Sequence, residues 1–215
     1  MRVSMQIAIS RLHYPVTTLG PGRRVGIWLQ GCKIRCPGCI SLDTWAEGKG
    51  ATTVDEVVRA VAPWLAEADG VTISGGEPFD QPDALAALLS ELPLRDAQDV
   101  LLYSGYPYEQ IEALPAVRQG RIDALMSEPY LVDAPQTLPL RGSDNQRLHL
   151  LTELGRLRFS EFQAPGAASG KSLDVMFDDD GTVWIAGIPK SGDMARLRSV
   201  LSAQGHEIHT TASRA

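Results

Sequence analysis

The sequence predicts an α/β protein built on a mostly parallel sheet. Short apolar segments alternate along the chain with segments whose apolar residues recur at helical spacing. Parallel strands need long crossover connections, and the expected helices supply them. The length of 215 residues, residues 1–215, suits a single domain with a real core.

The first half of the chain contains two expected strand–helix units. Val25–Leu29 (VGIWL) is an apolar run that leads into a cysteine-containing loop. Thr53–Ala68 has apolar residues at helical spacing, with Thr53 as the N-cap. Val71–Ser74 (VTIS) is a strand that ends at a glycine pair, and Asp80–Leu92 is expected to form the next helix.

The second half continues the same alternation. Its expected strands are Val100–Tyr103, Ile122–Met126, Leu148–Thr152, Leu173–Phe177 and Thr182–Ala186, and its expected helices are Glu109–Leu114 and Ser191–Gln204. Asp178–Gly181 (DDDG) is expected to turn the chain between the last two strands. Ala164–Lys171 is small and polar, which indicates a loop.

Composition and charge exclude several classes of protein. Hydrophobic residues make up 44% and charged residues 21%, and the net charge of −6 argues against a nucleic-acid partner. No apolar run approaches the roughly 18 residues of a membrane span. Met1–Ser10 lacks a basic region followed by an apolar one, so no secretory signal is expected. We therefore expect a cytoplasmic protein with no membrane partner.

All three cysteines lie in one loop, where Cys32, Cys36 and Cys39 are spaced C-x3-C-x2-C. An odd number of cysteines this close together favours a metal site over a disulfide framework. Three thiolates can hold three irons of a [4Fe–4S] cluster, which leaves the fourth iron open to a small chelating ligand. Structural zinc is usually bound by four Cys or His ligands in paired spacing, and the four histidines are scattered along the sequence. Zinc and redox-active thiols are the alternatives.

The segment GPGRRVGIWLQGCKIRCPGCISLDTW resembles the opening of the activating enzymes of anaerobic ribonucleotide reductase, within the radical S-adenosylmethionine superfamily. The shared features are Gly-Pro-Gly-x-Arg at Gly20–Arg24, a hydrophobic strand, the cysteine loop, and the pair Thr44 and Trp45. The resemblance covers about residues 5–152 and leaves a C-terminal extension over about residues 155–215. It implies an incomplete (β/α)6 barrel with the cluster and its cofactor at the carboxyl ends of the strands.

A second motif, Ser74–Pro78 (SGGEP), lies between an expected strand and an expected helix. Gly75 and Gly76 let the backbone approach a ligand, and Glu77 can accept hydrogen bonds from a cationic amino group. A plain strand–turn–helix connection is the alternative. The motif is similar to the superfamily's GGEP motif, which binds the amino group of the cofactor's methionine. The resemblance therefore implies cofactor contacts at Gly75, Gly76, Glu77 and Pro78.

Three later segments resemble family segments near the cofactor. Tyr103–Tyr106 (YSGY) matches an aromatic-Ser/Thr-Gly-Tyr segment, and Arg141–Gln146 (RGSDNQ) matches Arg-Gly-Ser-x-Asn-Gln. Ser127–Tyr130 (SEPY) departs from the family's Asp-Gly-Pro-aromatic, and segments like Gly187–Pro189 line the adenine pocket in relatives. The alternatives are a strand-end turn, a plain loop and a core strand end. Besides the GGEP residues, those expected at the cofactor are Gly38, Ile40, Ser104, Tyr106, Asn145 and Ile188.

The resemblance implies a radical enzyme. A donor of the flavodoxin or ferredoxin type reduces the cluster, and S-adenosylmethionine is cleaved to methionine and a 5′-deoxyadenosyl radical. No catalytic side chain is expected beyond the cluster and cofactor, because the cofactor carries the chemistry. The first hypothesis is activation of a glycyl-radical enzyme such as anaerobic ribonucleotide reductase. The second, suggested by residues 155–215, is a small radical enzyme acting on a metabolite or peptide. The third is a non-catalytic iron–sulfur or zinc binding protein.

Overall fold

The computed structural model describes residues 4–166, 173–177, 183–190 and 192–205 of the chain. The strands are β1 Gln6–Val16, β2 Arg24–Leu29, β3 Ala51–Thr53, β4 Gly70–Gly75, β5 Asp99–Tyr103, β6 Ala124–Ser127, β7 Arg147–Leu150, β8 Leu173–Phe177 and β9 Val183–Gly187. The α-helices are α1 Val54–Leu65, α2 Pro82–Glu91, α3 Tyr108–Ile111, α4 Pro115–Arg118, α5 Glu153–Phe159 and α6 Asp193–Ala203. Short 3-10 helices span η1 Leu42–Thr44, η2 Pro78–Asp80 and η3 Ser160–Gln163.

The main sheet has seven strands in the order β3-β1-β2-β4-β5-β6-β7. Its centre is parallel: β2, β4, β5 and β6 run in one direction, with Arg24 opposite Gly70 and Gly70 opposite Asp99. The strands β1, β3 and β7 are antiparallel to their neighbours. The predicted α/β class is confirmed, and the expected strand–helix alternation accounts for the parallel centre.

Three strands of this sheet differ from the prediction. β1 and β3 were not expected. Most residues of β1 are only partly buried and its apolar run is limited to Ile7–Ile9, and β3 has only three residues. β7 was expected over Leu148–Thr152 and lies at Arg147–Leu150, but it runs antiparallel to β6. The connection from β6 to β7 contains no helix that could carry the chain back across the sheet, so the chain returns in the opposite direction.

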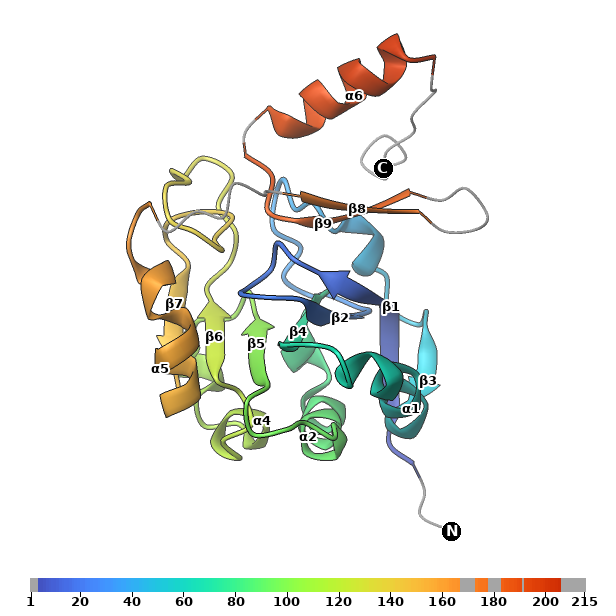
Figure 1. Cartoon of the computed structure of the whole chain (residues 1–215), viewed down its shortest axis with the longest axis vertical. Coiled ribbons are helices and arrows are strands. Elements are labelled where there is room, and N and C mark those ends of the chain that lie inside the picture. The colour runs from blue at the N-terminus through green and yellow to red at the C-terminus, as the bar shows by residue number, and fades with distance from the viewer. Residues whose placement is uncertain (1–3, 167–172, 178–182, 191, 206–215) are drawn as a thin grey trace.

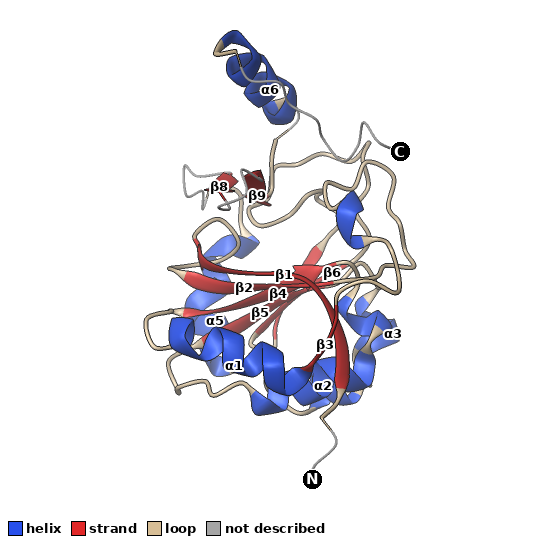
Figure 2. Ribbon diagram, turned by 90° about the vertical axis from the view of Figure 1, so that its right-hand side faces the viewer, coloured by secondary structure: helices blue, strands red, loops and turns tan. Residues whose placement is uncertain are grey.

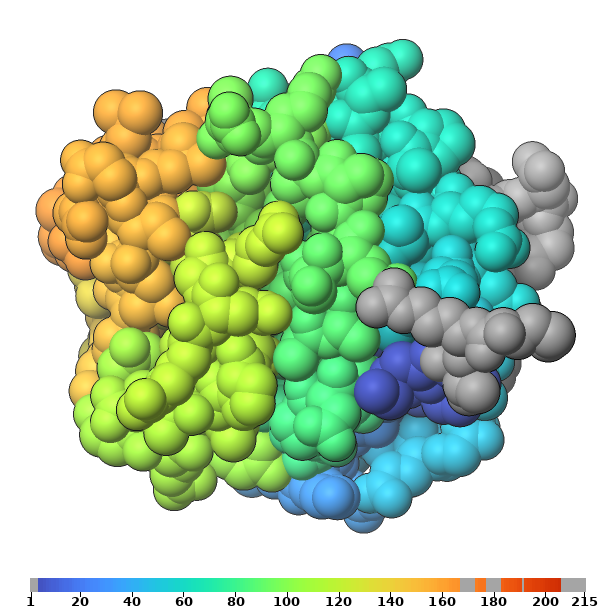
Figure 3. Space-filling model, turned by 90° about the horizontal axis from the view of Figure 1, so that it is seen from below, coloured from blue at the N-terminus to red at the C-terminus, as the bar shows by residue number. Residues whose placement is uncertain are grey.

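Helices α1, α2 and α4 cover one face of the sheet (Figures 1 and 2). Val25, Ile27 and Leu29 of β2 lie fully buried in the core between this face and the helices. The predicted N-cap of α1 is confirmed, because the Thr53 side chain accepts from the backbone of Glu56 in a capping box. In the space-filling view of this side, α1, α2 and the α3–α4 segment lie next to one another in chain order (Figure 3).

The opposite face of the sheet packs against α5 and against the hairpin β8–β9. The hairpin lies above the sheet in Figure 2. Phe159 of α5 packs with Leu101 and Met126, and Met176 of the hairpin packs with Val16 and Trp28. The last two expected strands therefore form a separate two-stranded sheet. The turn expected at residues 178–181 lies outside the described residues, as does most of the loop expected at residues 164–171.

Helix α6 follows the hairpin and lies beyond it, away from the main sheet (Figure 1). It corresponds to the helix expected over Ser191–Gln204, and it contains no buried residue. Among the described helices, α6 included, none combines the length and apolar character that crossing a membrane requires.

A buried ion pair joins the amino ends of the parallel strands. Arg24, in the Gly-Pro-Gly-x-Arg segment, pairs with Asp99 at 2.6 Å, and both side chains are fully buried. The guanidinium also donates to Thr72 Oγ1 at 2.6 Å and to the Val71 carbonyl at 2.7 Å. Gly70 lies between them, where a Cβ atom would come within 2.6 Å of the Asp99 carbonyl oxygen. The segment thus fixes three strand starts at the end of the sheet opposite the cysteine loop.

Candidate functional site

The carboxyl ends of three neighbouring parallel strands bring the predicted motifs together. β2 leads into the cysteine loop, β4 ends at Gly75, and β5 ends at Tyr103, immediately before Ser104. Because β2, β4 and β5 are adjacent and parallel, these ends share one edge of the sheet. Ligands of open α/β sheets bind at such an edge.

Backbone hydrogen bonds hold the start of the cysteine loop. The N–H of Gly31 donates to the Thr44 carbonyl at 2.7 Å, and that of Cys32 donates to the Trp45 carbonyl at 3.2 Å. Thr44 and Trp45 thus contact the loop through their main chain. This contact gives a structural reason for their place in the sequence pattern.

The three cysteines are free thiols, with Cys32 buried and Cys36 and Cys39 half-buried. Burial raises the pKa of the Cys32 and Cys36 thiols above the ordinary value. In the part of the chain that the structure describes, no three His, Cys, Asp or Glu side chains stand close enough together to hold a metal ion. Three free thiols on one loop still match in kind and number the donors of an open-sided [4Fe–4S] cluster. The donor set therefore fits the group.

The glycine pair of the second motif packs against the backbone that leads into the cysteine loop. Gly75 has φ +115°, and a Cβ atom there would lie 2.3 Å from the Leu29 carbonyl oxygen. A Cβ atom on Gly76 would lie 2.0 Å from the Gly31 carbonyl oxygen. The pair was expected to let a ligand approach, and the structure adds a second reason for it: no side chain fits between β4 and the loop.

Gly76→Ala should displace the cysteine loop, because its new methyl group overlaps the Gly31 carbonyl. We expect a loss of about 1–3 kcal/mol in the free energy of unfolding, typical of overpacking, and a lower yield of reconstituted cluster. Urea unfolding and the iron content after reconstitution measure the two effects. Lys49→Ala is the control, since that side chain is exposed. Equal iron content in both variants would contradict the prediction.

Glu77 lies at the centre of the site with a side chain that is only 1% exposed. Its Oε1 accepts from the Phe79 N–H (2.9 Å) and the Ser104 hydroxyl (2.9 Å), and its Oε2 accepts from the Gly105 N–H (2.7 Å). Burial raises the pKa of Glu77 to about 7, against these three donors, which lower it. A carboxylate has about four acceptor positions, so one remains on Oε2.

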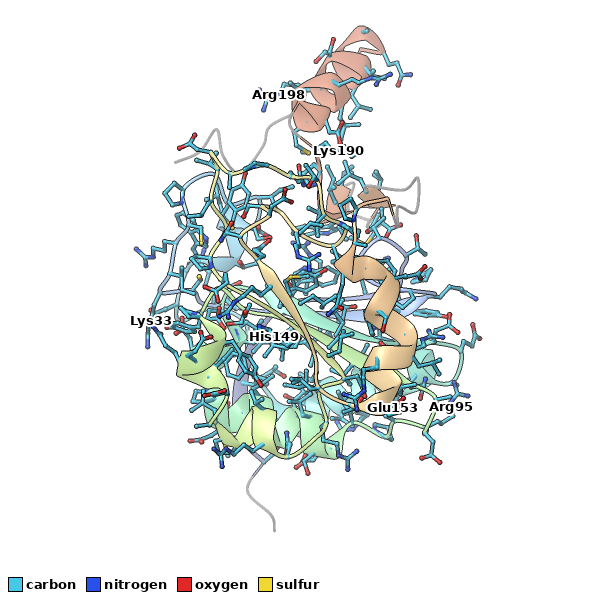
Figure 4. The ribbon with its side chains drawn as sticks, turned by 90° about the vertical axis from the view of Figure 1, so that its left-hand side faces the viewer. Lys33, Arg95, His149, Glu153, Lys190 and Arg198 are labelled. Atoms are coloured by element: carbon cyan, nitrogen blue, oxygen red, sulfur yellow. The ribbon has the colours of Figure 1, made fainter. Side chains whose placement is uncertain are left out.

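A hydrogen-bond network runs from Glu77 back to the cysteine loop. Ser104 Oγ, which donates to Glu77, accepts from the Tyr106 N–H at 3.0 Å. The Tyr106 hydroxyl donates to Asp80 Oδ1 at 2.8 Å, and Asp80 Oδ2 accepts from the Lys33 N–H at 2.8 Å. Lys33, labelled in Figure 4, lies at the outer edge of the molecule. Three of the expected cofactor residues, Glu77, Ser104 and Tyr106, thus belong to one network.

The buried Glu77 should make the stability of the metal-free protein depend on pH. Its pKa is about 7 when folded and near the ordinary 4.5 when unfolded, so the unfolded chain loses this proton first as the pH rises. The Glu77 contribution to the free energy of unfolding should therefore fall between about pH 4.5 and 7 and stay constant above. Glu77→Gln should lack this fall. Urea unfolding of both proteins from pH 4.5 to 8, under reducing conditions, measures this pH dependence. If the free energy of unfolding changes with pH in the same way in both proteins, the prediction is wrong.

The loop between β6 and β7 approaches the cysteine loop from another side. A Cβ atom on Gly38 would lie 3.1 Å from Val132 and 3.4 Å from Tyr130, so these segments are in contact. Asn145 donates from Nδ2 to the Pro129 carbonyl at 2.8 Å. Its Oδ1 is a buried acceptor for which the described residues supply no hydrogen bond. Asn145 and Gly38 thus both lie next to the Pro129–Val132 segment.

The other expected cofactor residues lie in different surroundings. Ile40 is 45% exposed just after the cysteine loop, and Pro78 is buried as the first residue of η2. Ile188 follows β9 and packs against the apolar cluster beneath the hairpin. Their contacts with a cofactor stay predictions.

Sequence reasoning missed Asp80 as a residue of this site. It was expected only as the first residue of the following helix, whereas its carboxylate joins Tyr106 to the cysteine loop. Its position three residues after Glu77, inside the same turn, was the available signal.

The α/β fold and the loop with three free thiols are typical of an iron–sulfur protein. Residues 18–149 match the family described as 4Fe-4S single cluster domain. The anaerobic ribonucleoside-triphosphate reductase-activating protein of Enterobacteria phage T4 is 31% identical over 134 residues, 60% of this chain and 85% of the relative. The pyruvate formate-lyase-activating enzyme of Staphylococcus aureus (strain USA300) is 43% identical over 82 residues, 35% of this chain and 33% of the relative. The crystal structure of QueE from Escherichia coli, at 18% identity, covers 46% of this chain and 53% of its own with a TM-score of 0.37.

The chain belongs to the 4Fe-4S single cluster domain family and, within it, to the radical S-adenosylmethionine activating enzymes. It is an enzyme whose cofactors are a [4Fe–4S] cluster and S-adenosylmethionine, as predicted.

Proposed function

We propose that this enzyme activates a glycyl-radical enzyme of the anaerobic ribonucleoside-triphosphate reductase kind, by taking a hydrogen atom from a backbone glycine of that partner. The observation that carries the proposal is the match with 85% of the length of the phage T4 activating protein, at 31% identity. This match favours the first hypothesis over an enzyme that modifies a metabolite or peptide. The non-catalytic alternative has no such support.

Cys32, Cys36 and Cys39 are assigned to the cluster. The bound cluster and S-adenosylmethionine supply the reducing electron and the 5′-deoxyadenosyl radical. The protein's own task is to orient the methionine end of the cofactor and to exclude water. Glu77 suits the first task, since its remaining Oε2 position can accept from an ammonium group and two strand ends fix its orientation.

The four parallel strands and their helices are assigned to an incomplete (β/α)6 barrel within a single domain of residues 1–215, with residues 155–215 as an extension. The electron donor is a flavodoxin or ferredoxin. The three free thiols suit a reducing compartment, the cytoplasm.

The first experiment is anaerobic reconstitution with iron and sulfide, followed by dithionite reduction with S-adenosylmethionine and an assay for 5′-deoxyadenosine. Cleavage supports the radical chemistry. Addition of anaerobic ribonucleotide reductase should then give a stable glycyl signal on that partner in electron paramagnetic resonance. Cleavage without this signal, but with turnover of a metabolite or peptide, would favour the second hypothesis.

Glu77→Ala should weaken S-adenosylmethionine binding and leave the visible absorbance of the cluster in place. The expected loss is about tenfold or more in affinity, because a hydrogen bond to a charged group contributes about 1.5–3 kcal/mol. Equilibrium binding to the reconstituted protein measures it, and Glu91→Ala, at the far end of α2, is the control. Unchanged affinity would remove Glu77 from the cofactor site.

A further inference from the structure

The hairpin β8–β9 lies outside the matched family region, which ends at residue 149, yet it is firmly attached to the main sheet. Asp174 of β8 accepts four hydrogen bonds from the segment that follows β1. The Thr17 N–H and hydroxyl donate at 2.6 and 2.8 Å, and the Thr18 N–H and hydroxyl donate at 3.1 and 2.9 Å. A carboxylate held by four donors gives the hairpin a defined position.

A second contact leads from the hairpin towards the start of the cysteine loop. The guanidinium of Arg11 lies over the indole of Trp184, with Cζ 3.5 Å from the ring centroid. Arg11 Nη2 also pairs with Asp43 Oδ2 at 2.8 Å, and the two side chains are only 13% and 26% exposed. Asp43 belongs to η1, the segment whose neighbouring carbonyls at Thr44 and Trp45 accept from the cysteine loop.

A third contact reaches the other end of the cysteine loop. The Pro189 carbonyl, two residues after β9, accepts from Gln136 Nε2 at 3.2 Å. Gln136 lies in the loop between β6 and β7, the same loop that contacts Gly38 through Tyr130 and Val132. The extension is therefore linked to η1, which contacts the start of the cysteine loop, and to the β6–β7 loop, which contacts Gly38 near its end.

We propose that the hairpin β8–β9 holds the cysteine loop in position, with Trp184, Arg11 and Asp43 as positioning residues. An indole face and a carboxylate together fix the orientation of the guanidinium, and the fixed guanidinium in turn holds η1. This inference rests on the proposed function for the role of the loop, since the loop carries the cluster there. It gives the extension a structural task at the site.

The test uses the full-length chain without metal, under reducing conditions. Alkylation of Cys32 by iodoacetamide, followed by mass spectrometry, reports how often the loop opens, because this thiol is only 8% exposed. Trp184→Ala should speed alkylation by about threefold to tenfold, the effect of losing one partly desolvated cation–π contact. Trp184→Phe, which keeps an aromatic face, should restore most of the protection. Val175→Ala is the matched control, since that side chain is 45% exposed on the same hairpin.

Asp43→Asn provides an independent variant, because it weakens the ion pair and leaves the hairpin intact; it should also speed alkylation. In the reconstituted proteins, Trp184→Ala and Asp43→Asn should alter the electron paramagnetic resonance spectrum of the reduced cluster, whereas Trp184→Phe and Val175→Ala should not. Wild-type alkylation and spectra in Asp43→Asn would overturn the proposal, even if Trp184→Ala failed to fold. Neither readout depends on cofactor cleavage, so failure of this test leaves the proposed function standing. Loss of cleavage in the wild type would likewise leave the role of the hairpin in holding the cysteine loop standing.

Discussion

Cys36→Ala is expected to abolish both 5′-deoxyadenosine formation and glycyl-radical formation. The cluster needs three thiolates from the loop, and two cannot hold three irons of the cube. Because the cofactor pair carries the chemistry, no side chain can substitute for it, and the loss should reach at least about 1,000-fold. Iron content, visible absorbance and the 5′-deoxyadenosine assay measure the effect on the anaerobically reconstituted variant.

Lys33→Ala is the matched control in the same loop. It keeps all three thiols, and the contact of Lys33 with Asp80 is made by the backbone N–H, which alanine retains. The control should therefore bind iron as the wild type does. Full activity in Cys36→Ala would contradict the assignment of the cluster to these cysteines.

Arg24→Met is expected to give the largest loss of stability. The substitution leaves Asp99 fully buried, and removal of one partner of a buried ion pair costs about 3–5 kcal/mol. Arg158 also contacts Asp99, at 3.2 Å, so the loss should lie towards the lower end of that range. The substitution also removes the hydrogen bonds that the Arg24 guanidinium donates to Thr72 and to the Val71 carbonyl. Their loss weakens the attachment of β2 to β4.

Urea unfolding of the metal-free protein measures the effect. Arg23→Met is the control, since Arg23 is the exposed neighbour in the same segment. The double variant Arg24→Met with Asp99→Asn should recover part of the lost stability, because it also removes the buried charge that has lost its closer partner and keeps only Arg158. A loss of less than about 1 kcal/mol in the single variant would show that the pair contributes no more than a surface pair does.

The parallel centre of the fold was predictable from the sequence. Strands buried on both faces, such as β2 and β4, read as continuous apolar runs, and the helices between them show their amphipathic spacing. β1 was not predictable in this way, since most of its side chains are only partly buried and its apolar residues form no long run. The antiparallel direction of β7 depends on the connection before it, which carries no periodic signal.

By itself the sequence predicted the chemistry of the site. The spacing of Cys32, Cys36 and Cys39 and the run from Gly75 to Glu77 are local patterns, and their meaning does not depend on distant residues. Only the tertiary structure decided which residues support that chemistry. Asp80 accepts a hydrogen bond from Lys33 of the cysteine loop, 47 residues earlier in the sequence. Asp174 accepts one from Thr17, 157 residues earlier. Such contacts leave no periodic pattern in the chain, because they arise from the packing of elements whose order in space differs from their order in sequence.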